Sequence, residues 1–524
     1  MAGHPYIPRL LPLHLPRICV ALQAPTAAEL FEKAEAAVRD NPFIELRLDY
    51  LKQHAPVFQK LRRFVDFHPE ALLVATCRRA AGGGKFRGSL AAQVDILVKA
   101  AACGCQFIDL EFESVSALKS KDLDRLRAAA ASILSFHDFR ATRKLQETFQ
   151  KMAAFPADYY KVVSTAGSLY DNVVMMKFLE RESEKHSMIG LCMGEQGIIS
   201  RVLCVRAGSV FTFASASPGE ETAPGQIAAR TLRETYRLEQ VDAATKVYGV
   251  AGDPVAHSLS PLMMNTALRR ENVNGVYLAL HATTIADLMA CVRDIPLHGL
   301  SVTMPYKQAI LQYLDNTDTV SEKIGACNTV IRAQDGKLYG YNTDVAGVVR
   351  PLEQRLHLAN AKVLVVGAGG AARAAVFGLK ERGAEVFIMN RTASVGQKLA
   401  RQARAKFLNR TQMRDLEFDV IVNATPVGMN GGKVSPLGEK ELNARVLFEM
   451  VYTPAETRLV KMARAKGMHV ITGAEMFVQQ GARQFEIWTG KPAPADDMYR
   501  VVTMALQARA ANGQKNSAPE LVAS

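Results

Sequence analysis

The sequence predicts an α/β protein in which a (β/α)8 barrel precedes a two-domain α/β unit with a dinucleotide-binding parallel sheet. Two observations indicate this class. Short apolar runs alternate with helical patterns eight times before residue 241, and a glycine-rich turn follows the apolar run 362–366. At 524 residues the chain is too long for one hydrophobic core, so two or three domains are expected.

Composition restricts the kind of partner. The chain has 64 basic and 51 acidic residues, a net charge of +13, and its positive charges are scattered. No zinc-finger or aromatic-interleaved basic pattern occurs, so we expect small anionic ligands rather than nucleic acid. The eight cysteines contain no Cys-x-x-Cys pair and predict reduced core thiols in a cytoplasmic protein without a metal site. We also expect no signal, transit or membrane-spanning segment.

The first half contains the strand candidates of the barrel. In such barrels the catalytic residues lie at the carboxyl ends of the strands. The expected strands are 18–22, 43–48, 72–77, 107–111, 132–136, 159–164, 187–192 and 210–213.

Two of these strands carry residues suited to carbonyl chemistry. Lys161 lies inside an apolar strand, and lysine is rarely buried without a function. In a desolvated pocket near other cations its amine loses the proton more readily, and the free amine attacks a carbonyl to form a Schiff base. His137, after the preceding strand, is placed to transfer protons next to that carbon. A snorkelling lysine and a hydrogen-bonded core histidine are the alternatives for each residue alone.

Four motifs then carry a family resemblance. The sequences SFHDF at 135–139, ISR at 199–201, TAPGQ at 222–226 and the strand of Lys161 resemble type I 3-dehydroquinate dehydratase over about residues 15–240. The resemblance implies that Lys161 forms the Schiff base, that His137 removes and returns protons, and that Arg201 binds the substrate carboxylate. It assigns further substrate contacts to Glu45, Arg47, Arg78, Thr222 and Gln226.

One position departs from that family. The resemblance places a glutamate four residues after Arg78, where it orients the histidine, and this chain has Gly82 there. Loss of an orienting carboxylate weakens proton transfer, while the lysine remains. We therefore predict a dehydratase that is active but slow.

A new strand begins at Val247 after a short boundary near 239–245. The turn at 252–261 presents Ser258 and Ser260, whose hydroxyls are suited to hold a carboxylate, although a serine-rich helix cap is an equal alternative. Lys307 follows a strand, and Asn328 and Asp344 follow later. Together these three would bind a polyhydroxylated ring and give one hydroxyl an acid–base partner.

The glycine-rich turn indicates a dinucleotide cofactor. Gly367 permits the tight turn, Gly369 permits close approach of a pyrophosphate, and Ala372 permits helix–strand packing. The next strand ends in Asn390-Arg391-Thr392, without the acidic residue that binds an NAD ribose. A guanidinium pairs with a 2′-phosphate, which favours NADP. A solvated strand-end charge is the alternative for Arg391.

These motifs in register resemble shikimate dehydrogenase over about residues 246–508. The resemblance makes Lys307 and Asp344 the catalytic pair and NADP(H) the cofactor. It assigns substrate binding to Ser258, Ser260, Thr303, Asn328 and Gln480. It assigns cofactor binding to Gly367, Ala368, Gly369, Gly370, Ala371, Asn390, Arg391, Thr392, Thr425 and Met429. The expected division is a barrel at 1–241, a substrate domain at 246–345 with a returning helix at 489–511, an NADP domain at 346–488 and a disordered tail at 512–524.

The two resemblances support each other, because the product of the first reaction is the substrate of the second. We therefore predict a bifunctional enzyme acting on 3-dehydroquinate, 3-dehydroshikimate and shikimate, with no nucleic-acid or membrane partner and an open oligomeric state. Three alternatives are a quinate/shikimate dehydrogenase with a weak or inactive barrel, an NADP-binding regulatory protein, and an aldolase-like barrel joined to an unrelated reductase.

Overall fold

The structure is a computed structural model that describes residues 14–255, 258–295, 297–429, 432 and 434–515. It divides into two compact units. One contains the chain up to Thr245 together with Leu280–Ile295, and the other contains Lys246–Ala279 and the chain from residue 296 onward. Residues 256–257 of the serine-rich turn and 516–524 of the predicted tail lie outside the described residues.

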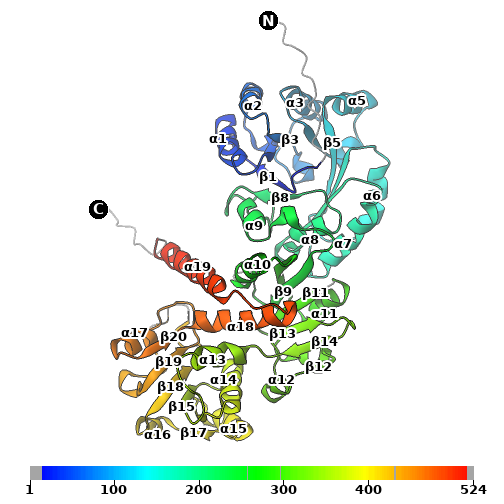
Figure 1. Cartoon of the computed structure of the whole chain (residues 1–524). Coiled ribbons are helices and arrows are strands. Elements are labelled where there is room, and N and C mark those ends of the chain that lie inside the picture. The colour runs from blue at the N-terminus through cyan, green and yellow to red at the C-terminus, as the bar shows by residue number, and fades with distance from the viewer. Residues whose placement is uncertain (1–13, 256–257, 296, 430–431, 433, 516–524) are drawn as a thin grey trace, which may run out of the picture. The chain divides into compact units, whose positions relative to one another are not determined.

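The predicted eight-stranded barrel is confirmed (Figure 1). Its parallel strands run in the order β7-β6-β5-β4-β3-β2-β1-β8. They are β1 (Ile18–Leu22), β2 (Phe43–Arg47), β3 (Leu72–Thr76), β4 (Phe107–Glu111), β5 (Ala131–His137), β6 (Tyr159–Thr165), β7 (Met188–Met193) and β8 (Thr212–Ser215). Because β8 pairs with β1 and Val210 N–H donates to the Met188 carbonyl of β7, the strands form a nearly closed ring.

Helices follow most of these strands, as the alternating pattern predicts. They are α1 (Ala27–Val38), α2 (Ala55–Phe67), α3 (Leu90–Ala102), α4 (Phe112–Val115), α5 (Ser120–Ala129), α6 (Leu145–Ala153), α7 (Asp171–Glu182), α8 (Ser200–Arg206) and α9 (Ala229–Glu234).

The barrel interior changes from apolar to charged along each strand. The Phe43 ring packs on Phe107 and Phe211, with centroids 5.7 and 4.8 Å apart. Since strand side chains alternate between faces, Glu45 on β2 and Asp109 on β4 share the face of these aromatic rings, two residues nearer the carboxyl end. Apolar packing therefore fills one end of the barrel and the charged residues collect toward the other.

The second sheet has the order β10-β9-β11-β13-β14-β12 and is mixed, with β9 and β11 parallel and β13 antiparallel to β11 and β14. Helices α18 and α19 contribute Phe485 and Val502 to a core shared with Tyr248 and Met263. The elements of this part are β9 (Lys246–Gly252), α10 (Ser260–Arg270), β10 (Gly275–His281), α11 (Ile285–Asp294), β11 (Leu297–Val302), β12 (Asn316–Thr317), α12 (Thr319–Ile324), β13 (Thr329–Arg332), β14 (Leu338–Tyr341) and α13 (Asp344–Glu353), with α18 (Gly473–Thr489) and α19 (Ala495–Lys515) near the C-terminus.

The third sheet is wholly parallel and has the order β17-β16-β15-β18-β19-β20. Its chain order reverses between β15 and β18, which is the point where such sheets bind nucleotides. Its elements are β15 (Lys362–Val366), α14 (Gly370–Glu381), β16 (Glu385–Met389), α15 (Ala393–Ala403), β17 (Lys406–Phe407), α16 (Arg410–Arg414), β18 (Phe418–Asn423), β19 (Ala444–Glu449), α17 (Arg458–Ala465) and β20 (His469–Ile471).

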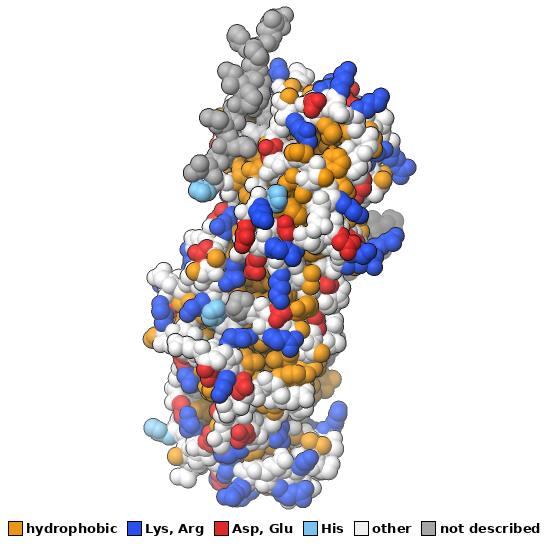
Figure 2. Space-filling view, turned by 90° about the vertical axis from the view of Figure 1, so that its right-hand side faces the viewer, with side chains coloured by type: hydrophobic (Ala, Val, Ile, Leu, Met, Phe, Trp, Pro, Cys, Tyr) orange, Lys and Arg blue, Asp and Glu red, His pale blue; other side chains and the backbone are white. Residues whose placement is uncertain are grey.

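Three further features concern the surface charges, the cysteines and the hydrophobicity of the helices. Figure 2 shows Lys and Arg side chains interspersed with Asp and Glu on the visible face. All eight cysteines are free thiols, and seven of them are buried. Among the described residues, no helix combines the length and apolar character that crossing a membrane requires.

Candidate active sites

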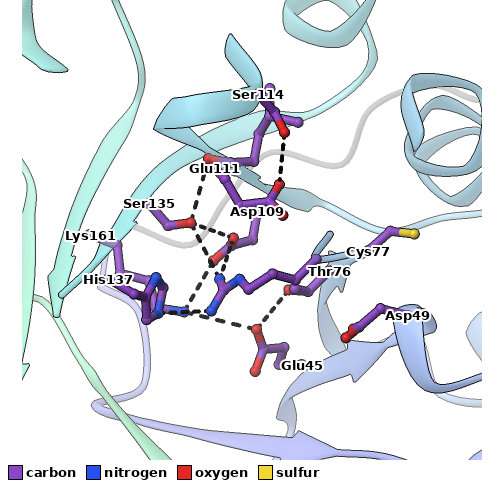
Figure 3. Close-up of polar contacts among 12 residues, drawn as sticks. Glu45, Asp49, Thr76, Cys77, Asp109, Glu111, Ser114, Ser135, His137 and Lys161 are labelled. Atoms are coloured by element: carbon purple, nitrogen blue, oxygen red, sulfur yellow. Dashed lines mark hydrogen bonds and ion pairs between the residues drawn. The ribbon is translucent and has the colours of Figure 1, made fainter. Parts of the chain in front are cut away.

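Lys161 occupies the middle of the barrel. Strand β6 carries it directly opposite Ser135 of β5. Its Nζ lies 3.0 Å from Asp109 Oδ2 and 3.9 Å from Glu45 Oε1 (Figure 3), and it sits 3.6 Å from the centroid of the Phe213 ring. The side chain is 5% exposed. The charged groups that contact Lys161 are two carboxylates rather than the cations expected from the sequence, and they hold the buried side chain in one place.

Asp109 is a site residue that the sequence reasoning missed. It is buried on β4 and binds Lys161 with one oxygen and Arg78 Nη2 with the other, at 2.7 Å. Burial opposes ionisation, but Lys161 and Arg78 overcome it and hold the pKa of Asp109 well below its usual value. Its signal in the sequence was a charged residue in an apolar strand, two positions before Glu111.

His137 ends β5 and joins this group through Arg78, whose Nη1 lies 2.8 Å from His137 Nε2. Desolvation lowers the pKa of His137 well below its ordinary value, and the charges of Arg78 and Lys161 lower it further. The predicted pair is therefore brought into one cluster, with His137 attached through Arg78 and Lys161 attached through Asp109 (Figure 3). The imidazole is therefore neutral, which is the form that can accept a proton, but its Nε2 is bonded to Arg78 in this arrangement.

The remaining predicted barrel residues lie in two places. Arg47 makes two 2.9 Å hydrogen bonds to Asp49 on the next turn of chain. Gln226 Oε1 accepts hydrogen bonds from the backbone N–H of Thr222, at 2.7 Å, and from its hydroxyl, at 3.2 Å, after β8. The structure thus brings the predicted residues Thr222 and Gln226 together, while Asp49 was not foreseen.

Arg201 is the strongest candidate for binding an anion. Its guanidinium is buried on α8 and donates to the carbonyls of Phe213 and Pro224, at 3.3 and 3.0 Å. Its Nε has no partner among the described residues, and burial lowers the pKa of Arg201 to about 10. A buried cation with an unused donor is suited to a carboxylate ligand.

The second cluster joins the loop after β11, the start of β13 and α13. Lys307 Nζ lies 2.6 Å from Asp344 Oδ2, and Asn328 Nδ2 donates to Asp344 Oδ1 at 2.8 Å. Asn328 Oδ1 in turn accepts from the backbone of Thr343, so its amide is fixed in orientation. The three residues predicted from scattered motifs therefore form one hydrogen-bonded group, in which a carboxylate orients a partly exposed ammonium.

A buried layer that the sequence reasoning missed supports this cluster. Gln484 on α18 donates to the Asn328 carbonyl and to Thr329 Oγ1, at 3.1 and 3.0 Å, and accepts from Ser301 at 2.8 Å. Ser301 also bonds the Tyr277 hydroxyl, at 2.6 Å. No sequence spacing links these positions, because they lie on separate strands and a distant helix.

The other predicted substrate contacts lie outside that group. Ser258 Oγ accepts the Ser260 backbone N–H at 3.1 Å just before α10, whose N-cap residue is Leu259 and has no side-chain cap. The Gln480 amide donates to the Phe477 carbonyl of its own helix. In the part of the chain that the structure describes, neither Thr303 nor Gln480 makes a side-chain hydrogen bond to Lys307 or Asp344.

The glycine turn provides room for a diphosphate. Gly367 has a φ of +117°, which disfavours other residues, and a Cβ there would lie 3.0 Å from the Ala424 carbonyl oxygen. A Cβ at Gly369 or Gly370 would meet nothing within 4 Å. The open backbone faces the N-terminus of the 12-residue helix α14, whose free N–H groups attract phosphate. The other two residues predicted for this turn are Ala368, between the two glycines, and Ala371, in the first turn of α14.

The remaining predicted cofactor contacts flank that turn. Asn390 Nδ2 donates to the Thr392 carbonyl, at 2.9 Å, and leaves Arg391 exposed between them at the end of β16. Thr425 follows β18 and bonds Asn423, at 2.7 Å, and Met429 is 49% exposed. The exposed guanidinium of Arg391 is of the type that pairs with a 2′-phosphate. No group of three or more His, Cys, Asp or Glu suited to a metal occurs in the described residues.

Together, the fold and the two clusters define a chain with two catalytic units, a barrel lyase with a buried lysine and a dinucleotide-dependent dehydrogenase. Comparison with family models supports both. Residues 18–243 match type I 3-dehydroquinase, 250–330 match the shikimate dehydrogenase substrate binding domain, 351–429 match shikimate/quinate 5-dehydrogenase, and 473–503 match the shikimate 5'-dehydrogenase C-terminal domain.

One relative matches most of the chain and another matches about half of it. The chloroplastic bifunctional 3-dehydroquinate dehydratase/shikimate dehydrogenase of Arabidopsis thaliana is 33% identical over 511 residues, which span 93% of this chain and 84% of that protein. The shikimate dehydrogenase (NADP(+)) of Maridesulfovibrio salexigens is 39% identical over 47% of this chain and 92% of its own length. The chain therefore belongs to the family of bifunctional 3-dehydroquinate dehydratase/shikimate dehydrogenases.

Among solved structures, one resembles half of the chain and another resembles most of it. Shikimate 5-dehydrogenase from Thermus thermophilus, in complex with NADP(H) and shikimate, is 36% identical over 50% of this chain and 100% of that chain, with a TM-score of 0.47. Dehydroquinate dehydratase and shikimate dehydrogenase from S. pombe is 24% identical over 93% of this chain and 98% of that chain, with a TM-score of 0.45.

Proposed function

We propose that the chain converts 3-dehydroquinate to shikimate in two steps, using the residues named above. In the barrel, the Lys161 amine condenses with the substrate ketone to give an imine and one water. His137 takes a proton from the carbon beside the imine and returns it to the departing hydroxyl, which leaves as water. Hydrolysis of the imine regenerates the lysine and releases 3-dehydroshikimate.

The second step reduces the ketone of 3-dehydroshikimate. NADPH, when bound at the Gly367–Gly370 turn, supplies the hydride. Lys307 donates a proton to the developing alkoxide, and Asp344 fixes the ammonium and shares its proton. Ser258 and Ser260 hold the substrate carboxylate, and Thr303, Asn328 and Gln480 contact ring hydroxyls. The two serines favour shikimate over quinate, whose extra hydroxyl needs room near the carboxylate.

The observation that carries this proposal is the presence on one chain of two lysine–carboxylate clusters, Lys161 with Asp109 and Lys307 with Asp344. The test supplies the purified chain with 3-dehydroquinate and NADPH and follows enone absorbance and NADPH loss together. We expect both signals. NADPH loss only when 3-dehydroshikimate is supplied would contradict the barrel assignment, and neither signal would favour an NADP-binding regulatory protein.

Domain limits and location form part of the same proposal. We place the barrel at 1–241, the substrate domain at 246–345 with 489–511, and the NADP domain at 346–488. A cytoplasmic location is supported by the eight free thiols. Fractionation of cells that make the full chain tests the location, and recovery of activity with the organelle or membrane fraction would contradict it.

A further inference from the structure

The contact between Arg78 and His137 determines which imidazole nitrogen carries the proton. A guanidinium has only donors, so at 2.8 Å the Arg78 Nη1–H must point to an unprotonated Nε2. The neutral ring therefore carries its proton on Nδ1. The structure thus contains a cation hydrogen-bonded to the base, where a carboxylate partner would favour a protonated ring.

The second terminal nitrogen of Arg78, Nη2, is bonded to Asp109 and Ser135. Arg78 Nη2 donates to Asp109 Oδ1 at 2.7 Å and to Ser135 Oγ at 3.3 Å, and Arg78 is 6% exposed. The other oxygen of Asp109 holds Lys161. A continuous set of bonds therefore runs from the lysine through Asp109 and Arg78 to the histidine, and it fixes the distance between the two reacting groups (Figure 3).

The carboxylates of the neighbouring loop and strand are not available to orient the ring. Position 82 is glycine, and a Cβ there would lie 3.4 Å from Glu111 Oε1. Glu111 itself accepts hydrogen bonds from the Arg79 backbone and from Gln93, at 2.5 and 2.6 Å. Among the contacts of the described residues, the polar partner of His137 is Arg78.

We propose that Arg78 is the positioning residue of His137, which fixes the ring in the Nδ1–H form and keeps it neutral before substrate binds. This inference rests on the proposed dehydratase role of His137, and it describes how the ring is oriented in a chain with Gly82 until Arg78 releases Nε2 and the ring takes a proton.

The charges around the ring favour the same state. Arg78 from the end of β3, Lys161 from β6 and Arg47 from β2 oppose protonation, and Asp109 from β4 favours it. Phe139 stacks on the ring at 5.9 Å and carries no charge. With burial added, the balance holds the pKa of His137 well below its ordinary value.

The test is an NMR titration of the ligand-free full chain labelled with ¹⁵N-histidine, with the His137 signals assigned from their loss in His137→Gln. In the wild type we expect the Nδ1–H form and no protonation until well below pH 6.5, the ordinary histidine value being about 6.5. In Arg78→Gln we expect a titration about one pH unit or more higher and a mixture of tautomers. Arg87→Gln, at an exposed position of the same loop, serves as the control and should match the wild type.

Two results would overturn the proposal: an Nε2–H form in the wild type, or an unchanged titration and tautomer in Arg78→Gln. If that variant does not fold, Arg78→Lys carries the same test. The ammonium of lysine keeps the positive charge but cannot donate to Asp109 and His137 at the same time from two positions, as the guanidinium does. We therefore expect a His137 titration between those of the wild type and Arg78→Gln, and a mixture of tautomers. Wild-type titration and tautomer in Arg78→Lys would contradict the positioning role of Arg78. Because no substrate is present, either failure is distinct from failure of the coupled assay.

Discussion

Asp109 and Lys161 lie 3.0 Å apart inside the barrel, and Asp109 also binds Arg78 through its second oxygen. One carboxylate therefore compensates two buried cations. Removing one partner of a buried charged group leaves the others unpaired, which costs about 3–5 kcal/mol. The position of Lys161 thus depends on a residue with no direct part in the proposed chemistry.

From this arrangement we predict that Asp109→Asn abolishes most dehydratase turnover and lowers barrel stability by about 3–5 kcal/mol. Because folding lowers the pKa of Asp109, its ionised carboxylate stabilises the barrel fully at pH values above the pKa of the unfolded state. This stabilisation is lost as the pH falls through the pKa of the folded state. Turnover and denaturant unfolding measure the two effects, and dehydrogenase activity of the same chain is the control. Wild-type dehydratase turnover would contradict this role.

Borohydride trapping should locate the Schiff base. With 3-dehydroquinate present, reduction of the imine is expected to attach the substrate carbon skeleton covalently to Lys161, which intact-protein and peptide mass spectrometry detect. Lys161→Met should show no adduct. Lys307→Ala should still be trapped, because that lysine belongs to the other cluster. An adduct on any other lysine would contradict the assignment.

Lys307→Ala should lower the dehydrogenase kcat far more than it changes KM for 3-dehydroshikimate, because the ammonium donates its proton as the alkoxide forms. General acid catalysis contributes about 10²–10⁴-fold, and we expect a loss in that range. Steady-state kinetics with NADPH measures it. Since Lys307 bonds Asp344 and lies outside the barrel, dehydratase turnover should be unchanged. A variant that lost affinity alone would place Lys307 among the binding groups instead.

Arg391→Gln tests the choice of cofactor. Arg391 is exposed at the end of β16, and a charge-assisted bond to a 2′-phosphate contributes about 1.5–3 kcal/mol. We therefore expect KM for NADPH to rise by about 10–100-fold, while KM for NADH changes little. Arg404→Gln, which removes an exposed guanidinium at the C-terminal end of α15, provides a matched loss of charge. Equal weakening of both cofactors would contradict binding of the 2′-phosphate by Arg391.

The sequence predicted the fold because the relevant signals are local. Each barrel strand is a short apolar run, and Gly367 has the positive φ that the turn requires. Residue type and position after strands pointed to Lys161, His137, Lys307 and Asp344, the resemblances gave them roles, and the structure gathers them into two clusters. Asp109, Gln484 and the bond between Arg78 and His137 were not foreseen, because they depend on which side chains of separate strands and helices meet. Ser258 was predicted to hold a carboxylate, and whether it does so stays a prediction.

Gly82→Glu tests the predicted weakness of the dehydratase. Restoring a carboxylate after Arg78 should raise turnover if its absence limits proton transfer at His137. The structure adds a condition, because the new Cβ would lie 3.3 Å from Glu111 Cγ, so that side chain must yield by a few tenths of an ångström. Gly82→Gln has nearly the same size without the charge and separates crowding from electrostatics. Dehydratase kcat should rise in Gly82→Glu and not in Gly82→Gln, and an unchanged or lower kcat in Gly82→Glu would contradict the prediction that Gly82 makes the dehydratase slow.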